Sequence, residues 1–310
     1  MHTDRPLLGI VLMLSFCVLA PLADGIAKLL GYVAPLLLLL VVRFGVQALV
    51  LTPAVVMRMG TWELSRTQWL LMVGRTALHI SGIGLMFIAL RYLPLADAIA
   101  IAFVMPFILL LLGHFILGEE VGWRRIAAWL VGVVGTLLVI QPCFVNVGPI
   151  ALVPLLVAVI FAGFILVTRM IARDIDPFAL QAISGAMASA VLIPALGVAI
   201  LLGIDRINPD LLTPGVLWLM LCLGLLVTIA HVLMTLSLRY APASTLAPMQ
   251  YLEIPVAAGV GWLLFQEFPN GLALVGSIVT VSAGLYIIFR ERTLSRQQVQ
   301  LSQHQAPPAA

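Results

Sequence analysis

The chain has 310 residues, of which 63% are hydrophobic and only 9% are charged. Soluble domains carry roughly 25% charged residues, so this composition excludes a soluble globular protein and indicates a chain whose solvent is mostly lipid. The formal net charge of +3 is too small an excess to indicate nucleic-acid binding. Cys17, Cys143 and Cys222 have no paired spacing, so we expect neither a disulfide framework nor a zinc site.

A spanning helix needs about 20 mainly apolar residues, and charged residues, glycines and prolines divide this chain into ten such stretches. We therefore predict an all-α polytopic membrane protein with ten transmembrane helices and short loops. The first stretch resembles a signal peptide, but its apolar run continues past residue 20, so we expect a spanning helix. The predicted spans are 7–30, 34–56, 68–90, 95–117, 123–141, 148–171, 177–202, 212–237, 243–265 and 271–290. The polar tail 291–310 is predicted to be disordered and cytoplasmic.

The placement of arginines predicts how these helices are oriented. With the N-terminus in the cytoplasm, eleven arginines fall at the cytoplasmic face, and only Arg91 and Arg206 fall outside. The opposite orientation would reverse this ratio, and an odd number of helices would mix the two groups. We therefore expect a multi-pass protein of the bacterial inner membrane with both termini in the cytoplasm.

One phrase occurs twice along the chain. Leu90, Arg91, Tyr92 and Pro94 begin LRYLPLADAIAIAFVMPF, and the same four residue types return 148 positions later in LRYAPASTLAPMQYLEIPV. Five predicted helices separate the copies, and because five is odd, the two halves lie upside down to each other in the membrane. Inverted repeats are typical of carriers, whose halves can exchange inward-open and outward-open roles. Duplication retained only for packing is the alternative.

Further residues keep the same spacing. Glu119 and Glu267 lie 148 positions apart, and Pro106 and Pro255 lie 149 apart. Proline removes a helical hydrogen bond, and interruptions at matched positions of two halves are a sequence pointer to a transport site. We therefore expect Pro106, Pro248 and Pro255 to break their helices beside the substrate.

These motifs resemble the two EamA repeats of the drug/metabolite transporter superfamily. The resemblance covers 7–141 and 148–290 as two inverted five-helix repeats, and it implies a central cavity that transports a small organic metabolite. A narrower likeness, in LADGIAKLL (22–30) and LGEEVGWRR (117–125), is to S-adenosylmethionine uptake proteins and riboflavin importers. The second half departs from this pattern, because it has FAGFILVTR (161–169) where the first has LADGIAK.

Charged side chains in the bilayer core are costly, so those in the predicted spans should face a cavity or a partner. Asp24 and Lys28, four residues apart on one helix face, either bind substrate or neutralise each other. Arg43 and Arg75 offer guanidinium forks suited to a carboxylate or phosphate, or else make structural bonds. His79 lies four residues after Arg75 and is a candidate proton relay, or a packed hydrogen-bonding residue.

Glu253, in PMQYLEIP, is the most deeply placed carboxylate of the chain. It is a candidate for substrate contact and proton coupling, and pairing with Arg43 or Arg75 is the alternative. Gln250 and Tyr251 would add hydrogen-bond donors and an aromatic wall to the same site.

Three other residues have simpler interpretations. Asp97 is expected to stabilise the start of its helix through the helix dipole. His114 and His231 are isolated in the sequence, and we expect them to be packing residues.

The sequence therefore predicts a secondary transporter that works by alternating access, with proton coupling, exchange or neither. No Walker phosphate loop is present, so direct use of ATP is not expected. An integral-membrane acyl- or lipid-transferase is the alternative, but no HExxH or GxSxG motif supports an enzyme. We expect no cofactor and no metal. The expected partners are an amino-acid-like or nucleoside-like substrate and membrane lipid, not nucleic acid, and the protein would be a monomer or homodimer.

Overall fold

The computed structural model of the protein describes residues 6–59, 64–108, 111–112, 123–171, 175–204, 209–240 and 249–286. All regular secondary structure within these ranges is helical, which confirms the all-α prediction. The elements are α1 (Pro6–Leu30), α2 (Leu36–Met59), α3 (Arg66–Leu90), α4 (Leu95–Ala102), α6 (Trp123–Val147), η1 (Gly148–Leu152), α7 (Val153–Ile171), α8 (Pro177–Leu201), η2 (Pro209–Leu211), α9 (Pro214–Tyr240), α11 (Glu253–Phe265) and a last helix, Gly271–Tyr286. Each of the ten predicted spans overlaps a helix in the described part of the chain, although six stretches, not ten, are long and apolar enough to cross a membrane.

Local sequence signals fix several helix ends. Ser65 and Gln68 form a capping box at the start of α3. Asp176 caps α8 by accepting a hydrogen bond from the Phe178 amide, with a proline at the first helical position. α6 continues six residues beyond its predicted end at residue 141, and Gly148, with φ of 66°, follows its last residue. Glycine adopts this left-handed conformation without a steric penalty, which is why the helix ends there.

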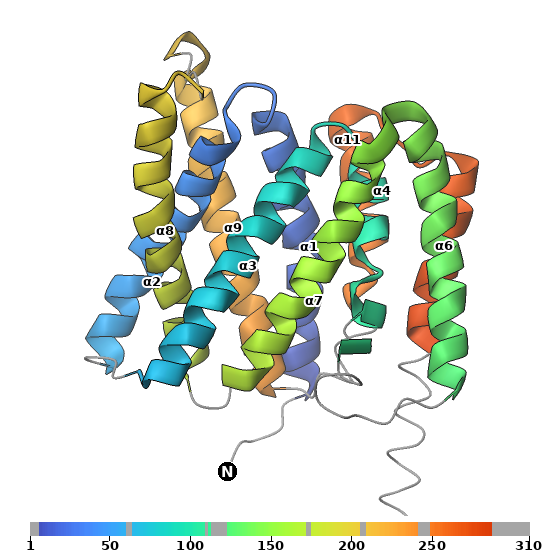
Figure 1. Ribbon diagram of the computed structural model, residues 1–310, viewed down its shortest axis with the longest axis horizontal. Helices are drawn as coiled ribbons and strands as arrows, with labels where there is room; N and C mark the ends of the chain where they lie inside the picture. Colours follow the sequence, from blue (N-terminus) through green and yellow to red (C-terminus); the bar gives the residue numbers. More distant parts are fainter. Residues whose placement is uncertain are drawn as a thin grey trace, which may run out of the picture.

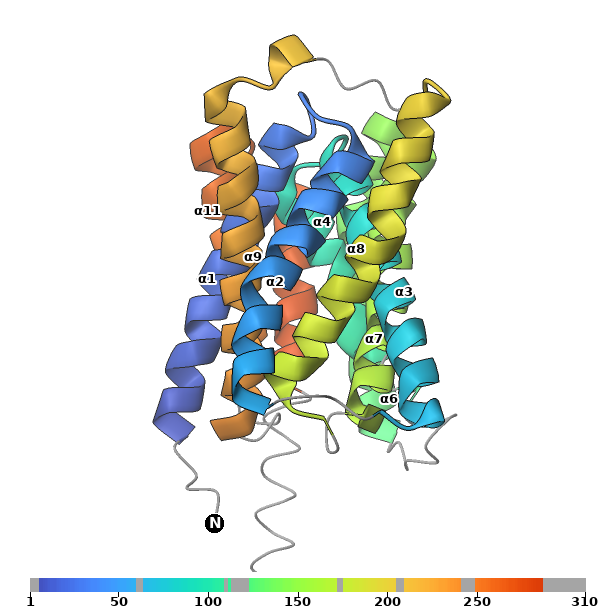
Figure 2. The ribbon, with the colours of Figure 1, turned by 90° about the vertical axis from the view of Figure 1, so that its left-hand side faces the viewer.

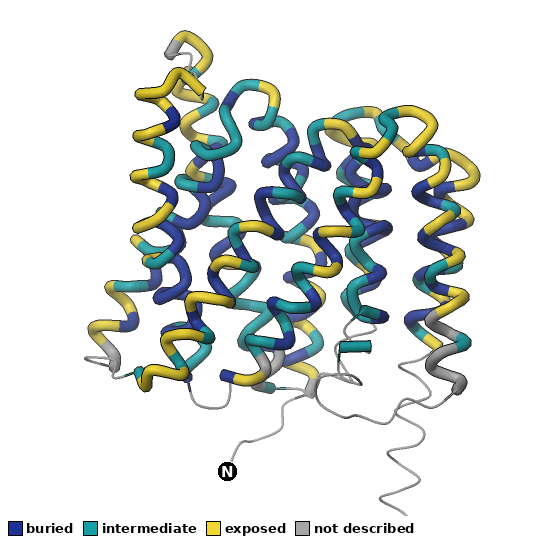
Figure 3. Tube along the Cα trace, in the orientation of Figure 1, coloured by how far each residue is buried: buried dark blue, intermediate teal, exposed yellow. Residues whose placement is uncertain are grey.

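The helices form a bundle with a lipid-facing exterior (Figure 1). Six stretches are long and apolar enough to cross a membrane, and one of them, Leu130–Thr168, contains both α6 and α7. Three shorter apolar helices accompany them. Large apolar side chains such as Leu49, Val145 and Trp218 are exposed, while buried residues gather toward the centre (Figure 3). Exposed apolar side chains on this scale require lipid as solvent, so the protein is a multi-pass membrane protein.

The main pairs of packed helices are kept when the two halves are exchanged. The helices α1, α2, α3 and α4 of the first half correspond in chain order to α7, α8, α9 and α11. α1 packs along α9 (Figure 2), and the corresponding pair is α7 with α3, which also pack together. α2 packs on its own counterpart α8, and α4 on α11. α1 rises from the end of the bundle marked N, whereas α7 descends toward it (Figure 1).

Both fourth helices are interrupted at equivalent positions. α4 ends at Ala102, and a turn at residues 103–104 precedes the next helical residues. In the second half a turn at residues 251–252 precedes α11, and each of its residues lies 148 positions after its counterpart. Pro106 and Pro255 follow these turns and lack the N–H that would bond to the carbonyl four residues earlier. Pro248 lies outside the described residues.

Candidate functional site

Arg75, on the buried face of α3, is held by hydroxyl groups of the second half. Its Nε donates to Thr168 Oγ1 at 3.0 Å, and its Nη1 donates to Ser184 Oγ. The guanidinium also lies 4.6 Å from the ring centre of Phe164. No carboxylate pairs with Arg75 in the part of the chain that the structure describes. Its bonds therefore fix α3 against α7 and α8.

His79 lies one helical turn further along α3 and has no exposed surface. The Phe44 ring meets it edge-on, with centroids 5.1 Å apart and planes at 90°, and the Phe164 ring lies 4.7 Å away. His231 of α9 approaches to 5.5 Å between ring centroids. His231 packs against other rings, as expected, and the packing of α9 brings it to His79, 152 positions away in the sequence.

The two histidines differ in their hydrogen bonds. His231 Nδ1 donates to the Val227 carbonyl at 3.0 Å, within its own helix. Neither ring nitrogen of His79 has a hydrogen-bond partner among the described residues, although both atoms are buried. Buried polar atoms are nearly always bonded, so His79 has unused capacity for two hydrogen bonds.

Arg43 on α2 reaches the same region. Its side chain is 3% exposed, its guanidinium lies 5.4 Å from the Phe44 ring centre, and its Nε is without a partner within the described ranges. Its charge interacts electrostatically with Asp24 on α1 and with both histidines. Arg43 is therefore the buried cation of this site with an unused donor.

Glu253 is the first residue of α11, directly after the Tyr251–Leu252 turn. Its carboxyl group lies close enough to that of Asp24 on α1 for the two charges to repel each other. The alternative that Glu253 pairs with Arg43 or Arg75 is not seen, since the described residues form one ion pair and it lies elsewhere. Gln250 immediately precedes the turn and is partly buried.

Together these residues form what we call the central cluster. Its members come from three helices of the first half and three of the second. They are Asp24, Arg43, Phe44, Arg75, His79, Phe161, Phe164, His231 and Glu253.

Lys28 does not form the expected pair with Asp24. Its Nζ donates to the Leu93 carbonyl at 2.8 Å and to Glu267 Oε2 at 2.5 Å, and it lies 4.8 Å from the Phe265 ring centre. The lysine side chain is 2% exposed and that of Glu267 is 32% exposed. Lys28 therefore points away from the central cluster, because its long side chain reaches a carboxylate 239 residues away.

A second buried carboxylate lies at the same end of the bundle. Asp97, in the first turn of α4 as predicted, is 4% exposed and accepts a hydrogen bond from Cys143 Sγ at 3.5 Å. Its charge interacts with those of Lys28 and Glu267. We call Lys28, Leu93, Asp97, Cys143, Phe265 and Glu267 the Lys28 cluster.

Tyr251 lies apart from the central cluster. It is 3% exposed, its ring packs against Phe103 at 5.3 Å, and a Cβ placed on Gly284 would overlap its hydroxyl group. The aromatic wall expected at this position faces the last helix and α4. His114, like Pro248, lies outside the described residues.

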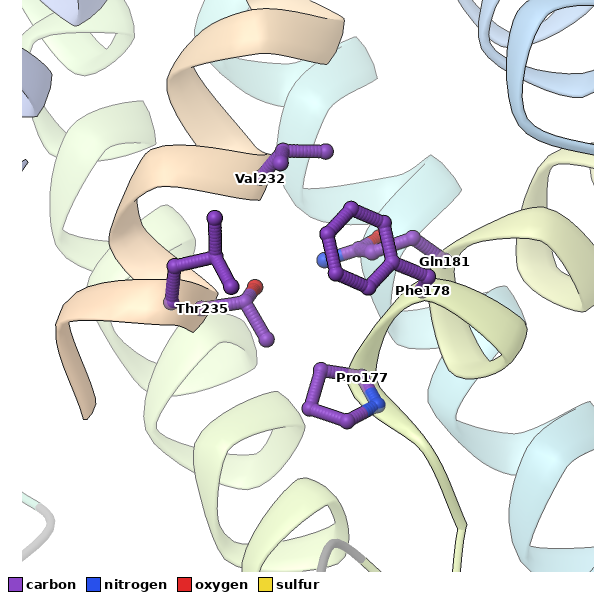
Figure 4. Close-up of a pocket in the computed structure, with 6 residues that line it drawn as sticks. Pro177, Phe178, Gln181, Val232 and Thr235 are labelled. Atoms are coloured by element: carbon purple, nitrogen blue, oxygen red, sulfur yellow. The ribbon is translucent and has the colours of Figure 1, made fainter. Parts of the chain in front are cut away.

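A small notch lies between α8 and α9 (Figure 4). Its lining is mainly apolar. Gln181, which lines it, accepts a hydrogen bond from Gln47 Nε2 on α2 through its carbonyl at 2.8 Å. The lining residues are Pro177, Phe178, Gln181, Val232, Thr235 and Leu236.

Sequence reasoning missed several residues of these clusters. Phe44, Phe161 and Phe164 gave no signal, since apolar side chains occur throughout a membrane protein. His231 could have been singled out as one of few titratable groups in an apolar span. Glu267 was noted only as a mark of the repeat. Among the described residues, no group of three or more His, Cys, Asp or Glu side chains is arranged to hold a metal ion.

Comparison with known proteins places this geometry in a family. The model of the EamA-like transporter family matches residues 7–141 and 148–290. A crystal structure that is 20% identical shares the fold with a TM-score of 0.62, covering 92% of this chain and 97% of that one.

Several relatives carry the names of transporters. A riboflavin transporter of Brucella anthropi is 27% identical over 251 residues, or 80% of this chain and 87% of the relative. An S-adenosylmethionine uptake transporter of Rickettsia prowazekii is 25% identical over 92% of this chain and 93% of the relative. A pseudopaline exporter of Pseudomonas aeruginosa is 30% identical over 64% of this chain and 67% of the relative. The chain belongs to the EamA-like transporter family, and it is a multi-pass membrane transporter of a small molecule rather than an enzyme.

Proposed function

We propose that the protein is a secondary carrier that moves a small organic metabolite across the bacterial inner membrane by alternating access. The moving parts are the two inverted repeats, 7–141 and 148–290, with both termini in the cytoplasm. The observation that carries this proposal is that the main pairs of packed helices are kept when the halves are exchanged. Two halves with the same packing have two arrangements of similar energy, which is what alternating access requires.

The central cluster is the proposed substrate site. It contains the buried charges of Arg43 and Arg75 from the first half and the partly buried Glu253 from the second, and charges in a membrane span are costly unless they serve a ligand or partner. We assign substrate contact to Asp24, Arg43, His79 and Glu253, whose polar groups are not used up by structural bonds. Arg75 then acts as a positioning residue, because hydroxyl groups of the second half hold its guanidinium.

The Lys28 cluster is the proposed barrier at the opposite end of the bundle from the N-terminus. The Lys28–Glu267 ion pair joins α1 of the first repeat to the end of α11 in the second. If the N-terminus is cytoplasmic, this end faces outward, and outward opening requires the pair to break. An ion pair with one partly exposed partner is suited to this use, because water can replace its contacts when this end opens.

The relatives support a carrier of metabolites without fixing the direction of transport. Their names include an uptake transporter and an exporter. The solutes in these names, riboflavin, S-adenosylmethionine and pseudopaline, are therefore the first compounds to test with this chain.

The experiment is counterflow in proteoliposomes. Vesicles that contain the full chain are loaded with riboflavin, S-adenosylmethionine, amino acids or nucleosides, and uptake of the matching labelled tracer is followed. We expect transient accumulation of one solute class. No accumulation of any solute, in vesicles with folded protein and with imposed pH and voltage gradients, would overturn the proposal.

A further inference from the structure

We infer that the central cluster binds a planar, conjugated ring that carries both hydrogen-bond donors and acceptors, and that His79 is the residue at its centre. The inference rests on the proposed function and names its substrate class: metabolites whose recognised part is a heteroaromatic ring rather than an aliphatic chain.

Unused hydrogen-bonding atoms supply the first reason. Both ring nitrogens of His79 and Nε of Arg43 lack partners in the described part of the chain, and the two side chains are 0% and 3% exposed. A neutral imidazole offers one donor and one acceptor, and Arg43 Nε adds a second donor. A ligand that bonds to all three nitrogen atoms must present two acceptors and one donor close together, as the edge of a heteroaromatic ring does.

The surrounding side chains supply the second reason. Four rings approach His79 from three other helices: Phe44 from α2, Phe161 and Phe164 from α7, and His231 from α9. Aromatic faces and edges contact other conjugated rings favourably through stacked and edge-to-face arrangements. A ligand without a ring could bond the nitrogens of His79 through hydroxyl or carboxyl groups, but it would gain no ring-to-ring contact from these side chains.

The origin of the rings connects binding to transport. Phe44 and His79 belong to the first half, and Phe161, Phe164 and His231 belong to the second. A ring held between the halves keeps contacts with both while they rock. Ring faces in contact are separated by about 3.5–4 Å, so a ring between the two imidazoles would need their centroids about 2 Å further apart than the present 5.5 Å. To make this room, α3 of the first half would have to move away from α9 of the second half.

The test uses purified full-length protein in detergent and pairs of probes that differ in the ring. Riboflavin is compared with ribitol, and adenosine with ribose, by calorimetry, with quenching of flavin fluorescence as a second readout. We expect at least one ring compound to bind and its ring-free counterpart not to bind. Binding of ribitol or ribose as tight as that of the ring compound, or no binding of either ring compound to folded protein, would overturn the inference.

Variants locate the binding to the cluster. His79→Leu and Phe164→Leu should each weaken binding of the ring compound at least tenfold, while Phe87→Leu, a buried aromatic on the same helix as His79, should leave it unchanged. Each variant is first shown to be monodisperse with a melting temperature near that of the parent protein. If His79→Leu fails this check, His79→Gln, which keeps hydrogen bonds but no ring, replaces it with the same expectation. Unchanged binding in the folded variants would overturn the inference.

Counterflow separates this inference from the proposed function. Accumulation of an aliphatic solute only would leave the carrier in place and overturn the ring site. Binding of a ring compound that depends on His79, with no counterflow of any solute, would support the ring site and overturn the carrier.

Discussion

The rings of Phe103 and Tyr251 lie 5.3 Å apart, with their planes inclined by 46°. Each residue is the first of the turn that interrupts the fourth helix of its half, and the two are 148 positions apart. The halves therefore meet at equivalent residues, close to the axis that relates them. On its far side, the hydroxyl of Tyr251 lies where any side chain on Gly284 would be placed.

This arrangement predicts which glycines are essential. Gly284→Ala should destabilise the protein by about 1–3 kcal/mol, because the added methyl group must displace Tyr251 from a packed position. Gly135→Ala should do the same, since its Cβ would lie 2.8 Å from the Thr280 backbone nitrogen. Thermal unfolding in detergent measures both effects.

Gly259→Ala is the matched control for these variants. No atom lies within 4 Å of a Cβ placed there, so its melting temperature should equal or exceed that of the parent. A similar loss of stability in all three variants would mean that the close contacts at Gly135 and Gly284 are not the cause.

The Lys28–Glu267 pair predicts an asymmetry between its two partners. Glu267→Gln leaves a buried ammonium without its carboxylate partner, whereas Lys28→Met removes the charge and keeps the apolar stem. We expect Glu267→Gln to be the more destabilising, on the order of 2 kcal/mol, which is below the loss for a fully buried pair since Glu267 is partly exposed. Melting temperatures in detergent give the order of the two variants.

The double variant K28E/E267K tests the same pair in transport. It should recover part of the counterflow lost in K28E, because the ion pair is restored with reversed charges. Equal activity in K28E and the double variant would show that the pair is no barrier.

Glu253 predicts the pH dependence of transport. If it carries a proton, Glu253→Gln should make counterflow independent of pH across the neutral range, since an amide cannot titrate. Glu253→Asp keeps a carboxyl group and should keep a pH-dependent profile. A Glu253→Gln variant with the pH profile of the parent would remove this residue from proton coupling.

The hydrogen bonds of Arg75 lead to a prediction that their removal lowers the stability of the protein but not its affinity for the transported solute. Ser184→Ala removes the acceptor of Arg75 Nη1 and should cost about 1–3 kcal/mol, because a buried charged donor is left without its partner. KM for the transported solute should stay within about twofold, since Arg75 positions helices and does not contact substrate. A rise in KM of tenfold or more, at unchanged stability, would instead place Arg75 in the binding site. Ser189→Ala on the same helix, whose hydroxyl bonds only within α8, is the control.

The sequence by itself determined the architecture. A lipid solvent demands apolar helices of a minimum length, and each helix bonds its own backbone, so spans can be recognised without knowing their neighbours. The phrase that returns after 148 positions also located both interrupted helices without knowledge of their neighbours. The cost of charge in lipid was enough to single out Arg43, Arg75 and Glu253.

Only the tertiary structure decided which side chains meet. Lys28 lies one turn from Asp24 on α1 but pairs with Glu267, and His231 joins His79 across the two halves. Tyr251, two residues from Glu253, turns to Phe103 and Gly284 instead of the central cluster. Helical periodicity relates residues within one helix, whereas partners on different helices depend on how the helices cross and how far each side chain reaches. That information is spread over the packing surfaces of all the helices and is not carried by any local pattern.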